Sequence, residues 1–243
     1  MDKSKFLVFD SGVGGLNVFS RLIHNFSAAD FYYLSDGENC PYGSKSADEL
    51  KRLSLSVLKR YGADNFDGVI IACNTLSTNV LPYLKSKLSL PVFGVFPFCP
   101  ESGRTVLFAT PATAKSDYVK AMSDKMVVCP TPRLAADVER YIFDLEKVRL
   151  PRLIKGDFDN VVLGCTHYIY MKEKFARLYK KARILDGVDR TIGEFRRFFE
   201  NYEFSVTTFY PPRRVSVDHF LGANKYKNYT VFCRYHLKQT QTF

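Results

Sequence analysis

Gly68-Val-Ile-Ile-Ala-Cys-Asn-Thr75 and Asn160-Val-Val-Leu-Gly-Cys-Thr-His167 are the two stretches that decide the fold. Each is a short apolar run typical of a buried strand, and each ends in a cysteine followed by polar residues. A second pair precedes them in the same order, Phe6-Leu-Val-Phe-Asp-Ser11 and Val106-Leu-Phe-Ala-Thr-Pro111. Chance similarity of buried strands could explain either pair alone. The shared order favours a duplicated unit, and therefore two similar lobes.

Further apolar runs predict additional strands, and segments with helical periodicity lie between them. The clearest helix begins at the capping box Ser46-Ala-Asp-Glu49, continues with apolar residues at helical spacing, and ends at Gly62. Strands that alternate with helices predict an α/β fold with mostly parallel sheets. The remaining predicted strands are Phe31–Leu34, Val92–Phe96, Met126–Cys129 and Arg183–Asp186.

The join between the lobes is predicted at residues 97–103, which carry Pro97, Pro100 and Gly103. Residues 1–97 would form the first lobe and residues 98–204 the second. Part of residues 205–243 would complete the first lobe. This aromatic and basic tail shows strand-like alternation, and we assign it no chemical role.

Composition excludes several classes of protein. The 243 residues include 35 Lys and Arg against 25 Asp and Glu, a net charge of +10 spread along the chain. We expect a solvated basic surface that can attract an anionic substrate, and no nucleic-acid partner. No run approaches the ~18 apolar residues of a membrane helix, and no signal-peptide core is recognisable, so we expect a cytoplasmic protein without a membrane partner. Six cysteines and four histidines are scattered, which predicts free thiols and no metal site.

Polar clusters follow four of the strands or lie in loops beside them, where ligands of open α/β sheets bind. If the lobes are related by a pseudo-twofold axis, Cys73 and Cys165 face one another across a cleft. Inverting a carbon that carries an acidic proton needs a base on one face and an acid on the other, and two thiols can exchange these roles. Asp10 would assist Cys73 and His167 would assist Cys165, while helix N-termini would favour the thiolates. The clusters are Asp10-Ser11-Gly12, Pro41-Tyr42-Gly43-Ser44, Cys73-Asn74-Thr75 and Cys165-Thr166-His167.

Each cluster also has a purely structural interpretation. A lone cysteine at the end of a buried strand is usually a small core residue, and Asp10-Ser11-Gly12 has the composition of a turn. Gly12-Val-Gly-Gly15 lacks the lysine of a phosphate-binding loop. The two matched cysteines outweigh these interpretations. The other cysteines, at positions 40, 99, 129 and 233, are expected to be structural.

The clusters extend into four longer segments, Phe9-Asp-Ser-Gly-Val-Gly-Gly-Leu16, Pro41-Tyr-Gly43, Ala72-Cys-Asn-Thr75 and Leu163-Gly-Cys-Thr-His-Tyr168. In order and spacing these segments resemble the signatures of bacterial glutamate racemases, within the aspartate/glutamate racemase superfamily. The resemblance covers roughly residues 5–191. His167 favours glutamate, since related aspartate racemases usually carry a glutamate at that place.

This resemblance implies two α/β lobes with one active site in the cleft between them. It implies an isomerase that interconverts L- and D-glutamate without a cofactor or metal, supplying D-glutamate for peptidoglycan, cell wall biogenesis and cell shape. Cys73 would take the α-proton from D-glutamate and Cys165 from L-glutamate. Family members are commonly dimers, so a homodimer is expected. The residues that would bind substrate or assist are Asp10, Ser11, Tyr42, Gly43, Asn74, Thr75, Thr166 and His167.

Several positions depart from the family pattern. Phe96-Pro97 replaces Glu-Pro, Asp186-Gly187 replaces Asp-Ser, and the acidic residue expected after Cys129-Pro130 appears only as Asp137 or Glu139. These departures and the basic charge leave two alternatives open. One is a racemase or isomerase of another small acidic amino acid, and the other is an inactive binding or regulatory protein on a racemase fold.

Overall fold

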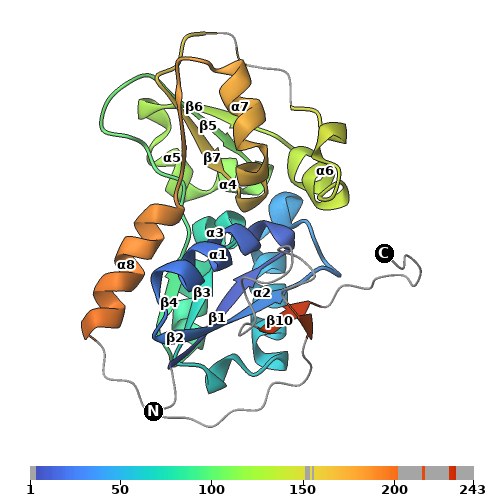
Figure 1. Ribbon diagram of the computed structural model, residues 1–243, viewed down its shortest axis with the longest axis vertical. Coiled ribbons are helices and arrows are strands. Elements are labelled where there is room, and N and C mark those ends of the chain that lie inside the picture. Colours follow the sequence, from blue (N-terminus) through green and yellow to red (C-terminus); the bar gives the residue numbers. More distant parts are fainter. Residues whose placement is uncertain (1–3, 151–153, 155, 202–214, 217–229, 234–243) are drawn as a thin grey trace.

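Two sheets with helices around them form the protein (Figure 1). The computed structural model describes residues 4–150, 154, 156–201, 215–216 and 230–233. The first sheet has the order β4-β3-β1-β2-β10-β9, and the second has the order β6-β5-β7-β8. Every neighbouring pair is parallel except β9 and β10. The strands are β1 Ser4–Asp10, β2 Ala29–Ser35, β3 Gly68–Ile71, β4 Val92–Gly94, β5 Thr105–Ala109, β6 Val127–Pro130, β7 Asn160–Gly164, β8 Arg183–Asp186, β9 Val215–Ser216 and β10 Thr230–Cys233.

The two sheets share one topology, which confirms the prediction of two similar lobes. The first four strands lie in the order β4-β3-β1-β2, and the next four lie in the equivalent order β8-β7-β5-β6. The sequence pairs noted above are therefore equivalent strands, β1 with β5 and β3 with β7. Because these strands are central and parallel, the polar residues that follow them gather at one edge of each sheet.

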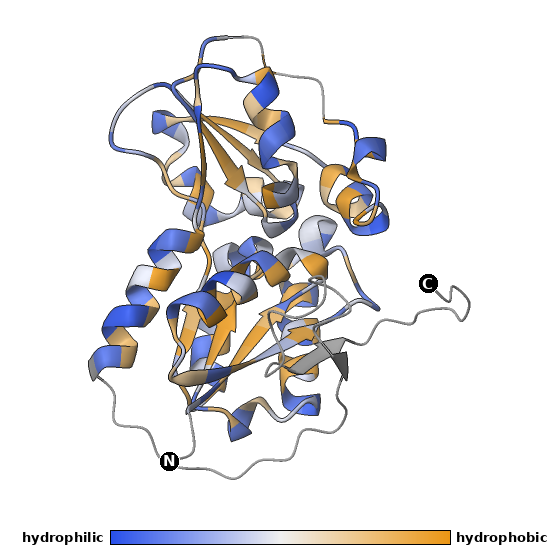
Figure 2. Ribbon diagram, viewed as in Figure 1, coloured by the Kyte–Doolittle hydropathy of each residue, from blue (hydrophilic) through white to orange (hydrophobic). Residues whose placement is uncertain are grey.

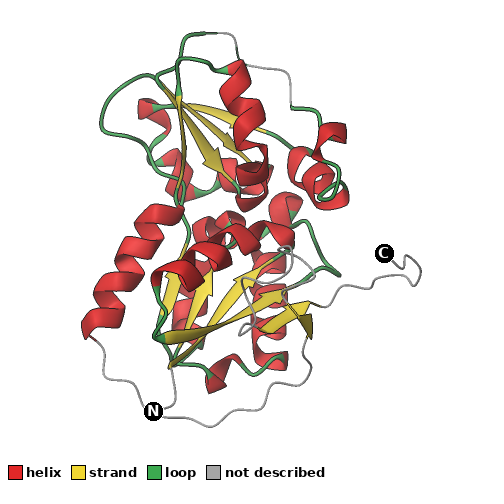
Figure 3. Ribbon diagram, in the orientation of Figure 1, coloured by secondary structure: helices red, strands yellow, loops and turns green. Residues whose placement is uncertain are grey.

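Helices cover both sheets (Figure 3). The predicted capping box is confirmed, since the Glu49 backbone N–H donates to Ser46 Oγ at 3.3 Å where α2 begins. No helix within the described ranges is both long and apolar enough to cross a membrane. The helices are α1 Leu16–Asn25, α2 Ala47–Arg60, α3 Asn74–Lys87, α4 Pro111–Lys115, α5 Asp117–Lys120, α6 Leu134–Arg140, α7 Lys172–Leu178 and α8 Val188–Asn201. The 3-10 segments are η1 Val13–Gly15, η2 Tyr42–Ser44, η3 Ala63–Asn65, η4 Ser123–Lys125, η5 Leu145–Lys147 and η6 Thr166–Met171.

The apolar strands of both sheets are buried between amphipathic helices (Figure 2). Successive side chains of a strand point to opposite faces, so one strand feeds two cores. Phe6 and Val8 of β1 pack in the cluster that contains α1, whereas Leu7 and Phe9 pack in the cluster that contains α2 and α3. Burial on both faces explains why the sequence shows continuous apolar runs here rather than alternation.

Helix α8 packs on the first sheet, although it follows the second lobe in the chain (Figure 1). The ring of Phe195 meets those of Phe6, Phe26 and Phe93 at centroid distances of 4.8, 4.9 and 5.4 Å. We had placed this helix in the second lobe, residues 98–204, and we now propose it as a helix of the first. The tail joins the same sheet through the backbone of β10, which pairs with β2. The rest of the tail lies outside the described residues.

Candidate active site

The polar ends of the central strands meet where the two lobes touch. Thr166 Oγ1, from the second lobe, donates to Asp10 Oδ2 at 3.0 Å. The backbone N–H of Val13, from the first lobe, donates to Glu139 Oε2 at 2.9 Å. Segments η1 and η6 are in contact here, and helix α3 contacts α4 and α5 across the same interface. The first and fourth clusters predicted from the sequence, from different lobes, thus lie in contact with one another.

Cys73 lies between β3 and α3 and is buried. Its Sγ is 4.0 Å from Ser11 Oγ. Burial raises the pKa of the Cys73 thiol well above its ordinary value, and the negative charge of Asp10 raises it further. The backbone N–H of Leu76 in the first turn of α3 acts in the opposite direction without reversing the shift. The helix N-terminus thus favours the thiolate at Cys73, as expected, but desolvation outweighs its effect and the net shift of the pKa is upward.

Asp10 is fully buried and serves as an acceptor for both lobes. Its Oδ1 accepts from the backbone N–H groups of Ser11 at 2.6 Å and Gly12 at 3.3 Å, and its Oδ2 accepts from Thr166. Burial raises the pKa of Asp10, against the opposing effects of His167 and of these hydrogen bonds. A carboxyl group that titrates closer to neutrality is better suited to exchange a proton with a neighbouring thiol.

Cys165 has different surroundings, because it precedes a 3-10 segment rather than a long helix. Its Sγ lies 3.8 Å from His167 Nδ1, and His167 Nε2 lies 2.6 Å from Glu139 Oε2. Burial alone would lower the pKa of His167, yet hydrogen bonds with Cys165, Cys40 and Glu139 hold that pKa well above its ordinary value. Cys165, His167 and Glu139 thus form a chain through which the thiol proton can move to the imidazole.

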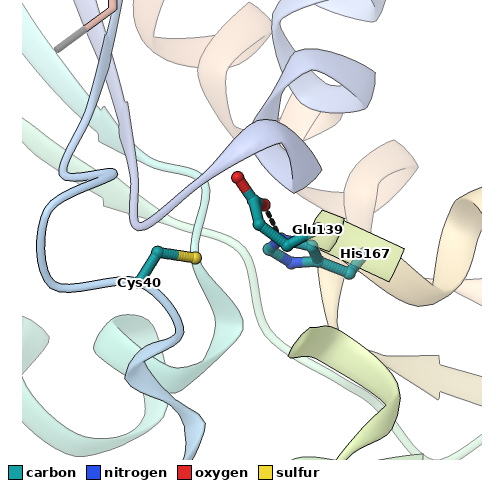
Figure 4. Close-up of side chains that lie close together, drawn as sticks. All are labelled: Cys40, Glu139 and His167. Carbon is teal, nitrogen blue, oxygen red and sulfur yellow. Dashed lines mark hydrogen bonds and ion pairs between the residues drawn. The ribbon is translucent and has the colours of Figure 1, made fainter. Parts of the chain in front are cut away.

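Cys40 is a further neighbour of His167 and Glu139 and lies in the loop between β2 and η2. Figure 4 shows its Sγ pointing toward His167 and Glu139. The potential ligand atoms of Cys40, Glu139 and His167 all lie within 4.8 Å of one another. The sequence predicts that Cys40 is structural and that the scattered cysteines and histidines form no such group. Folding instead brings one cysteine and one histidine together with a glutamate.

The predicted binding residues of the first lobe lie beside a group of threonines. The hydroxyl of Thr75 is 3.0 Å from that of Thr110 and 3.3 Å from that of Thr113, across the lobe interface. A Cβ at Gly43 would lie 2.7 Å from Thr110 Cβ, so the loop touches the same group. Asn74 donates its amide to Val95 O at 3.0 Å, and the Tyr42 hydroxyl donates to Asp36 Oδ2 at 2.5 Å. In this structure these two side chains are held by the protein.

One site residue has two candidates in the sequence, and three others are not predicted from it. Of the two acidic candidates after Cys129-Pro130, Glu139 is the one that contacts His167. Thr110 and Thr113 are not among the predicted site residues. They nevertheless follow β5, the strand equivalent to β1, and therefore lie at the edge of the second sheet that corresponds to the edge at Asp10. Cys40 gave no signal beyond its place one residue before Pro41-Tyr42-Gly43.

Two of the family departures are coupled in space. A Cβ at Gly187 would lie 1.8 Å from the carbonyl oxygen of Phe96, so no larger residue fits there without a backbone shift. The Phe96 ring in turn packs on Tyr118 at a centroid distance of 4.6 Å. Glycine at 187 thus matches the path of the chain at Phe96.

The chain is similar to curated glutamate racemases over most of its length. It is 30% identical over 215 residues to the enzyme of Clostridium acetobutylicum, covering 81% of this chain and 84% of that one. It is 32% identical over 206 residues to the enzyme of Campylobacter concisus, covering 76% and 79%. The crystal structure of Escherichia coli glutamate racemase with L-glutamate and the activator UDP-MurNAc-ala aligns with a TM-score of 0.70 and 26% identity, covering 85% and 86%. No protein-family model matches the chain.

Proposed function

From the premise that this chain belongs to the glutamate racemase family, we propose that it interconverts L- and D-glutamate by proton transfer between the α-carbon and two thiols, Cys73 and Cys165. The observation that carries the proposal is the placement of the two cysteines: each follows a central strand that ends where the lobes touch, and each has an acid–base group near it. A negative charge on Cys165 would raise the pKa of the Cys73 thiol further.

The surroundings of each thiol suggest its resting role. Cys73, whose pKa is raised by burial and by Asp10, is held as a thiol and serves as the acid. Cys165 lies 3.8 Å from the imidazole of His167, whose positive charge Glu139 stabilises, and these surroundings suit it to serve as the base. This assignment fits removal of the α-proton from L-glutamate by Cys165.

In that direction the Cα–H bond breaks and an S–H bond forms at Cys165. The electron pair remains on the α-carbon until the Cys73 thiol delivers its proton to the opposite face. Cys73 is left as a thiolate and Cys165 as a thiol. From this state the same steps run in reverse on D-glutamate, with Cys73 as the base. No atom is gained or lost, and neither thiol requires a cofactor.

Neighbouring polar groups are proposed to hold the substrate. The hydroxyls of Ser11, Thr75 and Thr166 and the backbone N–H groups beside Gly43 and Asn74 are suited to bind a carboxylate and an ammonium group. Tyr42 would act through its backbone, because its hydroxyl is engaged by Asp36. We further propose that the protein is a homodimer that acts in the cytoplasm and supplies D-glutamate for peptidoglycan.

The test is α-proton exchange in deuterium oxide with L- and D-glutamate. Wild-type protein should incorporate deuterium and invert both enantiomers, and Cys73→Ala and Cys165→Ala should each lose inversion. Cys99→Ala is the matched control, because Cys99 lies in the segment that joins the lobes and should retain wild-type rates. Inversion by either site variant at near the wild-type rate would refute the two-thiol mechanism, and exchange with aspartate alone would refute the substrate.

A further inference from the structure

We propose that Cys40, Glu139 and His167 form a binding site for one Zn²⁺ ion, and that the bound ion switches the enzyme off. The inhibitory half of this inference rests on the proposed function, whereas the binding half does not. The ligand atoms come from three separate segments, namely the loop after β2, helix α6 and segment η6 (Figure 4). Only the fold brings these segments together.

The donor set suits zinc among the common divalent cations. Thiolate and imidazole ligands favour Zn²⁺ over Mg²⁺ and Ca²⁺, which prefer oxygen alone. A thiolate from Cys40 and a carboxylate from Glu139 together balance the charge of the ion. His167 contributes a neutral nitrogen, and a water molecule can complete the tetrahedron.

The distances require only small movements. Zinc bonds to sulfur, nitrogen and oxygen place tetrahedral ligands about 3.3–3.6 Å apart. The three potential ligand atoms already lie within 4.8 Å of one another. Glu139 Oε2 and His167 Nε2, at 2.6 Å, would separate as the ion replaces the proton between them. The Cys40 thiol would release its proton to solvent on binding.

Two consequences of binding stop turnover. The ion would occupy His167 and Glu139, which are the groups that take the proton from Cys165. It would also join the Cys40 loop of the first lobe to α6 and η6 of the second. If glutamate enters and leaves between the lobes, an ion that cross-links them would slow both steps.

The first experiment measures binding without substrate, using Co²⁺ as a spectroscopic substitute for Zn²⁺. The reduced protein, freed of reductant, should develop a thiolate-to-cobalt charge-transfer band with one equivalent of Co²⁺. The band should be lost in Cys40→Ala and retained in Cys99→Ala. Absence of the band in wild type, or its persistence in Cys40→Ala, would overturn the site.

The second experiment measures α-proton exchange of L-glutamate at buffered free Zn²⁺, with each variant compared with its own metal-free rate. At ten times the Kd the wild-type rate should fall about tenfold. The inhibition constant should rise at least about tenfold in Cys40→Ala, because even outer-shell partners contribute that much to metal affinity. Equal inhibition of both would show that zinc acts on Cys73 and Cys165, and would refute the proposal. Absence of metal-free turnover would count against the proposed function, and the cobalt band would still decide the site.

Discussion

Replacing Glu139 with glutamine tests whether the pair of His167 and Glu139 serves the proton transfer at Cys165 and not the one at Cys73. Glu139 Oε2 accepts from His167 Nε2 at 2.6 Å and from the backbone N–H of Val13 at 2.9 Å. Glutamine keeps an acceptor of the same shape and removes the negative charge. Hydrogen bonds to charged groups are worth ~1.5–3 kcal/mol and neutral ones about half of that, so we expect a loss of ~0.8–1.5 kcal/mol in stabilising the imidazolium. This corresponds to a decrease of about 4- to 13-fold in kcat/KM.

The decrease must be equal in both directions. L- and D-glutamate have the same free energy in water, so the ratio of their kcat/KM values stays at unity in any variant. The asymmetry appears instead in isotope effects. With the step at Cys165 slowed, the α-deuterium effect should grow for L-glutamate, whose proton Cys165 removes, and shrink for D-glutamate.

The pH profile gives an independent readout. The pKa of His167 is raised well above its ordinary value in part by Glu139. The active imidazolium is present below this pKa and is lost as pH rises through it. Removing the charge lowers the pKa, so the alkaline limb of kcat/KM should move to lower pH in Glu139→Gln. Glu173→Gln is the matched control, because Glu173 is 87% exposed and its nearest cation lies 3.7 Å away. The proposed proton transfer through Cys165, His167 and Glu139 would be refuted by a folded Glu139→Gln variant whose kcat/KM is within twofold of wild type and whose pH profile is unshifted.

Three further predictions concern charge and packing. Arg21→Ala should lower the free energy of unfolding by ~2–3 kcal/mol in urea. In wild type Asp186 is 4% exposed and is paired with Arg21 at 3.0 Å, and the variant leaves this carboxylate without its cation. Arg177, which is paired with Glu173 at the surface, serves as the control, and Arg177→Ala should change stability by less than ~0.5 kcal/mol. Gly14→Ala should reduce turnover at least about tenfold, because its Cβ would lie 2.4 Å from Thr166 Oγ1 and 2.6 Å from His167 Nδ1, whereas Gly193→Ala, with its nearest atom 4.0 Å away, should raise stability by up to ~1 kcal/mol and leave turnover unchanged. Asp10→Asn should lower turnover at least about tenfold and should also flatten the pH dependence of the free energy of unfolding. A carboxyl group whose pKa is raised on folding stabilises the protein most below its unfolded pKa, and this contribution is lost as pH rises through the folded pKa. At neutral pH the variant should therefore be no less stable than wild type. A marked loss of stability at neutral pH would contradict this account.

The sequence could predict the lobes because the deciding information is local. The runs that became β3 and β7 are buried on both faces and therefore apolar throughout, and the cysteine after each marks the carboxyl end. Four polar clusters could be placed at one edge on this basis alone. The lobe to which α8 belongs is not predictable in this way, because nothing in the periodicity of the helix indicates which core receives Phe195; our proposal that it belongs to the first lobe rests on its tertiary packing.

Glu139 and Cys40 could not be assigned because their roles depend on tertiary packing, within the second lobe for Glu139 and between the lobes for Cys40. Glu139 is separated from His167 by 28 positions and sits on α6, a helix of seven residues whose position depends on the core around Val138. Asp137 occupies the same helix and offered the same charge. Only the rotation of that helix places Glu139 at the site, and rotation is a tertiary property.

The two lobes share a topology but differ at their cysteines, and the proposed reaction permits that difference. Cys73 precedes a helix of fourteen residues, and the negative charge of Asp10 raises the pKa of its thiol. Cys165 instead precedes a 3-10 segment, and its Sγ lies 3.8 Å from His167 Nδ1. Because the enantiomers are equal in free energy, the highest transition state on the path lies equally far above either free substrate, and the two individual proton transfers need not have equal barriers. The two thiols therefore do not need matched surroundings. In the proposed mechanism one thiol gives a proton and the other takes one, and the raised pKa of Cys73 suits the first role whereas the imidazole beside Cys165 suits the second.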